Sequence, residues 1–594
     1  MIANKHISKI IIAITAVAVA ACLVAPVFAA DLTDLLGGTG VNMEYETELF
    51  DTTEIIEINI VMDEDDWETM LSNAMSEEYY TCDVVVNGTT FKSVAIRPKG
   101  NTSLSAIAMD PDTDRYSIKL EFDHFVEGQT CFGLDKLILN NNYADATNMK
   151  EAIIYDMYEY LDADASLYNY AKVSVNGEYC GVYLALEAVE QSFMLRNYGT
   201  QDGELYKPDT MEMGGDNAGG GFGMGSESAG ADLNYTDDDL DSYQTIWDSE
   251  VTGTSKGDHR RVVTALKNIS EGTDLEEYLD VDNVLKYMAV HTFAVNMDSL
   301  SGSMSHNYYL YEYDGQLNIF PWDYNLSWGG MNMGFTSDGT EMINDAIDTP
   351  FSGTDFFDSL LENEEYLERY HEYLQQLVDE YVYGGRFDET YNRIRSQIDT
   401  LVAEDPTAFY TADEYEAAAE MLYKTVTLRA QSIAGQLDGT IPSTDAGQRE
   451  DSSSFVDGSE IDVEVMGVFS MGGFGGGSSD DGDDQDGSPS DDPGTGEMPG
   501  MGGFAPGDLP ADFDPENMPE GFDPGSMPAQ GGFPSGGPGG SSDAQSSSDT
   551  SFPASGMPGQ TAGLTSLNGV LTLASCFVIA VVSLIVVTVI KPKQ

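Results

Sequence analysis

The pattern of apolar and polar positions predicts a strand-rich first half for residues 55–440. Short runs in which apolar and polar residues alternate are typical of strands that bury one face. Asn87-Gly88 and Asn176-Gly177 each separate two such runs, and Asn-Gly favours the tight turn of a β-hairpin. Helical spacing interrupts the strands over 64–74 and 149–161. The expected strands are 55–62, 82–86, 91–96, 116–122, 136–139, 167–175 and 179–186.

The second half of this segment is mainly helical in pattern. Apolar residues there recur every three or four positions, as they do along one face of an α-helix. A further hairpin, 307–321, turns at Asp314-Gly315. We therefore predict an α+β fold with two lobes, a β-rich N-terminal part and a helical C-terminal part, with a cleft between them. The expected helices are 260–269, 275–294, 356–383, 387–402 and 412–437.

An apolar run near the N-terminus predicts export from the cytoplasm. Lys5 and Lys9 precede the run 10–27, which ends in small residues around Ala29. A short basic region, an apolar core and small residues at the end are the parts of a secretory signal peptide. We expect cleavage after Ala29. A lipobox ending at a lipidated Cys22 is the second interpretation, because the apolar run continues past that cysteine.

A second apolar run, 569–590, predicts a membrane anchor. At about 1.5 Å per residue it is long enough to cross about 30 Å of hydrocarbon. Lys591 and Lys593 follow it, as expected on the cytoplasmic side of a span. The sequence thus predicts a single-pass protein of the cell membrane with its folded domain extracellular, as on the surface of a Gram-positive bacterium.

Two further tracts of the chain are distinguished by their composition. The Gly/Met-rich tract 211–230 cannot bury a core and predicts a loop within the domain, and the Gly/Pro/Ser/Asp-rich tract 441–567 predicts a disordered stalk. The predicted organisation is a signal peptide (1–29), a lead-in segment (30–54), a folded domain (55–440) with the loop insertion (211–230), the stalk (441–567), a transmembrane helix (568–590) and a cytoplasmic tail (591–594).

The formal net charge of -76 limits the classes of partner. So acidic a surface repels nucleic acid and anionic lipid, and we expect neither as a partner. A calcium-dependent glycan-binding module is compatible with the charge, although acidity usually means no more than a solvated surface. Of the five cysteines, Cys82, Cys131 and Cys180 would remain in the exported domain, which at this size needs no disulfide framework.

Two segments suit the binding of a phosphorylated ligand. Arg97, Lys99, Asn101 and Ser103 follow an expected strand, and a loop of cations, small polar residues and glycine can hold phosphate oxygens. The alternative is an ordinary polar turn. Glu187 ends another strand, and Lys207 ends a nearby one. A lysine held by a carboxylate and directed at phosphates recurs in phosphoryl transfer. A surface ion pair is the more common fate of such residues.

Hard oxygen donors mark two later segments. Asp298, Asn307 and Asp323 lie at the ends of expected elements, where they could meet around Mg²⁺. Magnesium prefers one or two carboxylates together with substrate phosphates. His306 is expected to be structural. The sequence contains no HExxH, CxxC or GxSxG pattern, so a zinc hydrolase or a nucleophile-elbow hydrolase is disfavoured.

In order along the chain, these segments resemble the CotH family of atypical protein kinases, first described in spore coats. The resemblance spans about residues 55–440, and a motif taken alone is weak evidence whereas the ordered set is specific. The segments are RPKGNTSL at 97–104, LNNNYAD at 139–145, NGEYCGVY at 176–183 with Glu187, LYKP at 205–208, the stretch from Asp298 to Tyr309, and PWDY at 321–324.

The resemblance implies a divergent protein-kinase-like, two-lobed fold and transfer of the ATP γ-phosphoryl group to Ser-rich proteins with Mg²⁺. It implies that Asp298 and Asp323 are the catalytic aspartates, with Asp323 holding metal and Asp298 acting as base or second metal ligand. The expected metal ligands are Asp323, Asp298, Asn307 and Asn325, the last of which is an aspartate in many family members. Arg97, Lys99, Asn101, Ser103, Glu187 and Lys207 would bind the nucleotide.

Two function classes follow from these observations. The first is an exported, membrane-tethered Ser/Thr kinase with ATP and Mg²⁺, acting on Ser-rich surface or coat proteins and including its own stalk among the acceptors. The second is a non-catalytic cell-surface adhesin or coat-assembly scaffold on the same fold, because fold does not determine function. Binding of ATP with Mg²⁺ separates the two.

Overall fold

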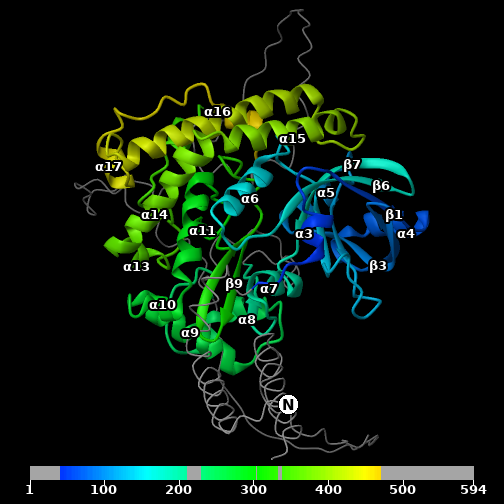
Figure 1. The fold of residues 1–594 in the computed structure, drawn as a ribbon, viewed down its shortest axis with the longest axis horizontal. Helices are drawn as coiled ribbons and strands as arrows, with labels where there is room; N and C mark the ends of the chain where they lie inside the picture. The colour runs from blue at the N-terminus through cyan, green and yellow to red at the C-terminus, as the bar shows by residue number, and fades with distance from the viewer. Residues whose placement is uncertain (1–39, 210–228, 303, 332–337, 470–594) are drawn as a thin grey trace, which may run out of the picture. The chain divides into compact units, whose positions relative to one another are not determined.

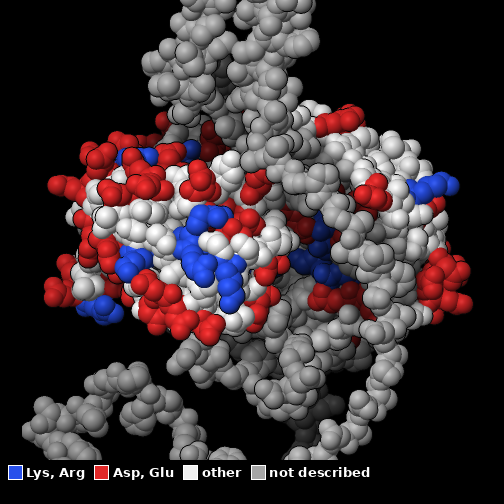
Figure 2. Space-filling view, turned by 90° about the horizontal axis from the view of Figure 1, so that it is seen from below, with Lys and Arg blue, Asp and Glu red and all other residues white. Residues whose placement is uncertain are grey.

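The computed structural model describes residues 40–209, 229–302, 304–331 and 338–469. The predicted signal peptide, nearly all of the Gly/Met-rich insertion and the predicted transmembrane helix lie outside these ranges. Figure 2 shows Asp and Glu side chains over much of the face seen from below. The acidity inferred from composition is therefore visible on this face of the folded part, which also carries a group of Lys and Arg side chains near its centre.

The first half of the described chain forms a closed barrel in the order β1-β2-β3-β4-β5-β7-β6. Neighbouring strands are antiparallel except β1 and β6, which run parallel from the Ile56/Ala171 pair to the Ile60/Val175 pair. Alternate residues of β1 are buried in the barrel, as the sequence pattern predicts. The strands are β1 (Ile56–Val61), β2 (Tyr80–Val86), β3 (Thr89–Lys99), β4 (Ser117–Glu121), β5 (Lys136–Asn140), β6 (Tyr168–Val175) and β7 (Glu178–Glu187).

A second, three-stranded sheet of order β10-β9-β8 lies among the later helices. Its strands are β8 (Glu204–Tyr206), β9 (Tyr308–Tyr313) and β10 (Gln316–Pro321). Figure 1 shows α15 and α16 side by side along one edge, and α15 contacts both α6 and β7.

The main helices are α4 (Glu64–Ser72), α5 (Thr102–Met109), α6 (Lys150–Tyr160), α7 (Gln191–Tyr198), α9 (Lys256–Ser270), α11 (Val281–Ala294), α14 (Glu364–Gln376), α15 (Arg386–Ala403) and α16 (Ala412–Leu437). Shorter elements are α3 (Glu44–Glu48), α8 (Gln244–Asp248), α10 (Leu275–Tyr278), α12 (Thr340–Ile343), α13 (Asp358–Leu361), α17 (Asp445–Glu450), the π-helical turn η4 (Leu377–Val382), and the 3₁₀ turns η2 (Ala74–Ser76), η3 (Leu240–Tyr243) and η5 (Val463–Met466).

Most elements predicted from periodicity are confirmed, and α16 has the predicted bounds. The predicted helix 275–294 is divided into α10 and α11. Leu279 pairs with Leu317 of β10, and the Asp280 side chain accepts a hydrogen bond from the backbone of Asn283 at the start of α11. A strand-like bridge followed by an N-cap therefore separates the two helices.

The predicted kinase-like, two-lobed fold with a transmembrane helix is wrong. The N-terminal strands close into a seven-stranded barrel because β1 pairs with β6, more than a hundred residues later in the chain. Local alternation of apolar and polar residues predicts the strands, but it cannot show that the first strand pairs with the sixth. The helical half also contains its own sheet, so strands and helices are not segregated into two lobes.

The predicted localisation as a single-pass protein of the cell membrane is corrected as well. Within the described ranges, no helix is both long and apolar enough to cross a membrane. The segment to which the span was assigned, 568–590, lies outside those ranges.

The described structure continues to residue 469, beyond the domain end predicted at residue 440. Ile461, Val463 and Met466 are buried, and the Met466 carbonyl accepts a hydrogen bond from the backbone of Ala146. Phe469 forms a parallel bridge with Met331. The segment after α17 thus packs onto the loop that precedes α6. The cysteines of the described chain, Cys82, Cys131 and Cys180, are free thiols.

Candidate functional site

A cavity of about 620 Å³ lies where the ends of β3 and β5 meet α6 and the second sheet. All but one of the site residues predicted from the sequence line it. These are Arg97, Lys99, Asn101, Ser103, Lys207, Asp298, Asn307, Asp323 and Asn325. The structure therefore brings together segments that are more than two hundred residues apart in the chain.

The wall after β3 is a strand that passes at once into a helix. Gly100 joins β3 to α5 at a φ of +137°, and a Cβ there would lie 2.9 Å from the Ser103 hydroxyl. Asn101 and Ser103 therefore lie at the beginning of a helix rather than in an open loop. The Asn101 amide donates to Asp209 over 3.1 Å. Arg97 is paired with Glu77 and lies 5.4 Å from the Tyr79 ring, so its charge is already compensated.

Lys99 is a half-buried cation of this wall. Its Nζ donates to Asn140 Oδ1 over 3.2 Å, and Asn140 Nδ2 donates to Glu151 Oε2 over 2.8 Å. Burial lowers the pKa of Lys99, although the charges of Asp323 and Glu151 oppose this. The sequence analysis missed both Asn140 and Glu151.

Glu151 belongs to the first turn of α6 and is 2% exposed. Burial, with the charge of Asp323, raises its pKa to about 8. Its Oε1 atom has no hydrogen-bond partner, which is uncommon for a buried carboxylate. A charged residue within the apolar periodicity of α6 was the signal that could have identified it.

Lys207 follows β8 and completes the cationic side. Its Nζ lies 5.6 Å from the Trp322 ring and 5.7 Å from the Tyr309 ring, and Lys99 lies 5.4 Å from the same Trp322 ring. Burial, followed by the like charge of Lys99, lowers the pKa of Lys207 to about 8. Two ammonium groups beside one indole ring concentrate positive charge in the cavity, which favours an anion there.

Asp298 also lines the cavity and is held by its neighbours. Its Oδ1 pairs with His306 Nε2 at 3.0 Å, and Asn307 Nδ2 donates to the Asp298 carbonyl and carboxylate over 2.8 and 3.2 Å. Burial lowers the pKa of His306, but the charge of Asp298 and their hydrogen bond outweigh it, so the pKa is raised. His306 thus lines the cavity as the partner of Asp298.

Asp323 follows β10 with a φ of +61°, in the left-handed region that few non-glycine residues adopt. In the described part of the chain, no hydrogen-bond donor contacts its carboxylate. Burial raises its pKa, while the charge of Lys99 lowers it and that of Asp298 raises it. The strained backbone therefore directs into the cavity a carboxylate that the protein does not neutralise by direct contact.

The oxygen donors on this side suit Mg²⁺. No group of three His, Cys, Asp or Glu side chains with metal-ligand spacing occurs among the described residues. Asp298 and Asp323 supply two carboxylates, and the amides of Asn307 and Asn325 donate through their nitrogens, which leaves their oxygens for a cation. Two carboxylates, amide oxygens and the oxygens of a phosphorylated ligand form a typical magnesium shell.

Glu187 is the predicted site residue that the structure places elsewhere. It is fully buried and accepts hydrogen bonds from Tyr45 and from two nitrogens of Arg196. We expect Glu187→Gln to leave ATP affinity within about twofold of wild type at pH 9, whereas Glu151→Gln strengthens ATP binding at that pH, because of these two glutamates only Glu151 gains a negative charge beside Lys99 as the pH rises through about 8. Calorimetric titration of ATP into both variants checks this, and equal effects would contradict it.

Two comparisons with known proteins agree with the motifs. The family model described as CotH kinase protein matches residues 96–433, which contain every residue discussed above as part of the cavity. The inner spore coat protein H of Bacillus subtilis (strain 168) is 24% identical over 217 residues, which is 34% of this chain and 53% of that protein. The chain thus matches about half the length of this curated relative.

Proposed function

Because this chain belongs to the CotH kinase protein family, we propose that it transfers the γ-phosphoryl group of ATP to Ser or Thr hydroxyls of proteins. One observation carries the proposal. Lys99, Lys207, Asp298 and Asp323 all line a single cavity, and Asp323 lies close enough to both lysines for their charges to lower the pKa of its carboxyl against the effect of burial. This arrangement supplies cations for phosphate oxygens and carboxylates for a metal ion and a proton.

Each group has a role in this proposal. Lys99 and Lys207 bind the phosphates of ATP, and Asp323 would hold Mg²⁺, which would supply positive charge to those phosphates. Asp298, oriented by His306 and Asn307, accepts the proton of the acceptor hydroxyl. The new bond joins the acceptor oxygen to the γ-phosphorus, the bond from that phosphorus to the β,γ-bridging oxygen breaks, and ADP leaves.

The acceptors that we propose are Ser-rich proteins of the coat type, by analogy with the printed name of the Bacillus relative. The chain's own Ser-rich tract within 441–567 is a second acceptor. Incubation of the full chain with Mg²⁺, ATP and a Ser-rich polypeptide, followed by mass spectrometry, should locate phosphoserine on both. A matched polypeptide with every Ser and Thr replaced by Ala should stay unmodified. Absence of phosphate from all Ser and Thr residues would overturn the proposal.

Nucleotide binding should weaken as pH rises through about 8. Lys207 loses its positive charge near that pH, and Glu151 gains its negative charge near the same pH. Both changes make the cavity less favourable for polyphosphate. We expect metal-free ATP to bind roughly tenfold more weakly at pH 9 than at pH 7, by proton linkage.

The matched variant for this experiment is Lys207→Met. It should bind ATP weakly at both pH values, and its remaining pH dependence should be that of Glu151 alone. An identical pH profile for wild type and variant would show that Lys207 does not titrate in this range.

A further inference from the structure

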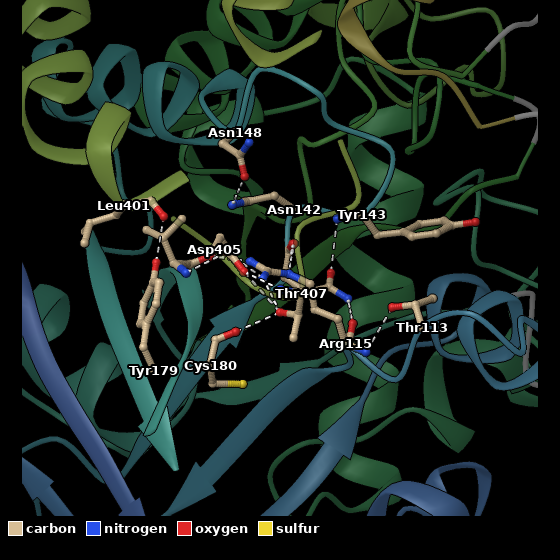
Figure 3. Close-up of polar contacts among 12 residues, drawn as sticks. Thr113, Arg115, Asn142, Tyr143, Asn148, Tyr179, Cys180, Leu401, Asp405 and Thr407 are labelled. Carbon is tan, nitrogen blue, oxygen red and sulfur yellow. Dashed lines mark hydrogen bonds and ion pairs between the residues drawn. The ribbon is translucent and has the colours of Figure 1, made fainter. Parts of the chain in front are cut away.

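A buried ion pair outside the cavity joins the barrel to the last helices. Arg115, just before β4, is 3% exposed, and its Nη1 donates to Asp405 Oδ2 over 2.7 Å and to Thr407 Oγ1 over 2.8 Å. Its Nη2 donates to the carbonyl of Val182 in β7 over 2.5 Å. Asp405 and Thr407 follow α15. Figure 3 shows this cluster, in which groups from the barrel and from the segment after α15 converge on Arg115.

The pair is packed so closely that its position is restricted. A Cβ at Gly181 would lie 2.4 Å from Arg115 Nη1 and 2.7 Å from Asp405 Oδ2, so only glycine fits there. Asp405 Oδ2 also accepts the backbone N–H of Val182 over 3.0 Å, and Thr407 Oγ1 donates to the carbonyl of Cys180 over 2.7 Å. The carboxylate and the guanidinium are therefore fixed relative to β7.

Arg115 in turn holds the chain that follows β5. Its Nε donates to the Asn141 carbonyl over 3.3 Å, and Asn141 Nδ2 donates to the Arg115 carbonyl over 2.6 Å. Asn141 Oδ1 then accepts the backbone N–H of Tyr143 over 3.1 Å. Asn141 and Tyr143 both line the cavity, whereas Arg115 and Asp405 do not. Hydrogen bonds through these two residues thus connect the ion pair to the cavity wall.

The last contact reaches the metal-binding side. The Tyr143 carbonyl accepts a hydrogen bond from Asn325 Nδ2 over 2.7 Å. A carbonyl oxygen can only accept, so the amide nitrogen of Asn325 must face Tyr143. The amide oxygen is then left for a cation beside Asp323, two residues earlier. An aspartate needs no such orientation, because both of its terminal atoms are oxygens.

We propose that Arg115 and Asp405 are positioning residues for the cation site, because through Asn141 they hold the backbone of Tyr143, whose carbonyl orients the Asn325 amide. This inference rests on the proposed Mg²⁺-dependent function. It also explains how Asn325 can serve as a metal ligand although only one of its two terminal atoms is an oxygen.

Asp405→Asn in the full chain tests the inference. With a non-hydrolysable ATP analogue bound, its apparent Mg²⁺ affinity by titration calorimetry should fall about tenfold, the lower range for changes in the partners of metal ligands. Affinity for the analogue without metal should stay within about twofold of wild type. Thr407→Val, which keeps the ion pair but removes the hydroxyl that bonds to both of its members, should show a smaller loss and serves if Asp405→Asn does not fold.

Two controls separate positioning from general destabilisation. Glu312→Gln breaks the Arg261–Glu312 pair in the second sheet, whose carboxylate is also buried, and should leave Mg²⁺ affinity unchanged. In an Asn325→Asp background, Asp405→Asn should lower the Mg²⁺ affinity by less than about twofold. An aspartate at position 325 presents an oxygen to the cation whichever way its carboxylate is turned.

The outcomes distinguish the inference from the proposed function. If wild type binds Mg²⁺ with the analogue and both Asp405→Asn and Thr407→Val bind it equally well, the inference is wrong and the proposed function stands. It is also wrong if Glu312→Gln weakens Mg²⁺ binding as much as Asp405→Asn does, or if the loss persists with Asn325→Asp. If wild type binds no Mg²⁺ at all, the inference and the proposed function both fall.

Discussion

Asp323→Asn is expected to lower the rate of phosphoryl transfer about a thousandfold, roughly 4 kcal/mol in the barrier. The carboxylate of Asp323 contacts no donor in the described chain, and its charge lies near those of Lys99 and Asp298. The amide keeps the size of the side chain and, like aspartate, tolerates the positive φ of this position. It removes the negative charge that a magnesium ion requires. Single-turnover transfer with saturating Mg²⁺ and ATP measures the effect.

Asp314→Asn is the matched control. Asp314 occupies the turn between β9 and β10 and also has a positive φ of +51°, but it does not line the cavity. Its replacement should leave the transfer rate within about twofold of wild type. If Asp323→Asn and Asp314→Asn transfer equally fast, Asp323 is not the metal ligand that we propose.

Asp156→Ala should cost about 3–5 kcal/mol of unfolding free energy, the effect of removing one partner of a buried ion pair. Asp156 is fully buried in α6. Two nitrogens of Arg386 donate to its carboxylate over 2.7 and 3.1 Å, and three hydroxyls donate over 2.8 to 3.0 Å. The hydroxyls belong to Tyr381, Thr390 and Tyr168. Alanine removes the acceptor that these donors share, and α6 also carries Glu151, so the cavity should loosen as well.

Urea unfolding at equilibrium measures this loss. Asp63→Ala, which removes an exposed N-cap of α4, provides the comparison and should cost only about 1 kcal/mol. A loss for Asp156→Ala no larger than that of Asp63→Ala would contradict the assignment of Asp156 as a central contact between α6, β6 and α15.

The helices and strands of this fold follow from local sequence patterns, but the closure of the first seven strands into a barrel does not. Alternation of apolar residues located β1 and β6, and helical spacing located α15 and α16. The parallel pairing of Ile58 with Val173 depends on contacts between distant segments, which no local pattern contains. The predicted open, kinase-like arrangement failed for that reason.

The candidate site shows the same division. Ordered motifs placed Lys99, Lys207, Asp298 and Asp323 near one another, since each lies at or shortly after the end of a strand or helix. Motif order could not tell which glutamate accompanies the lysines. Glu187 forms an ion pair with Arg196. Glu151 is connected to Lys99 by hydrogen bonds through Asn140, because α6 packs beside β5. Side-chain partners of this kind are determined by packing rather than by sequence order.

The most direct test of the account compares two labelled nucleotides. The full chain is incubated with Mg²⁺ and a Ser-rich acceptor, once with ATP labelled in the γ-phosphate and once with ATP labelled in the α-phosphate. Phosphoryl transfer predicts label on serine from the γ-phosphate alone, with release of ADP. Label from the α-phosphate, or no label from either nucleotide, would contradict the account.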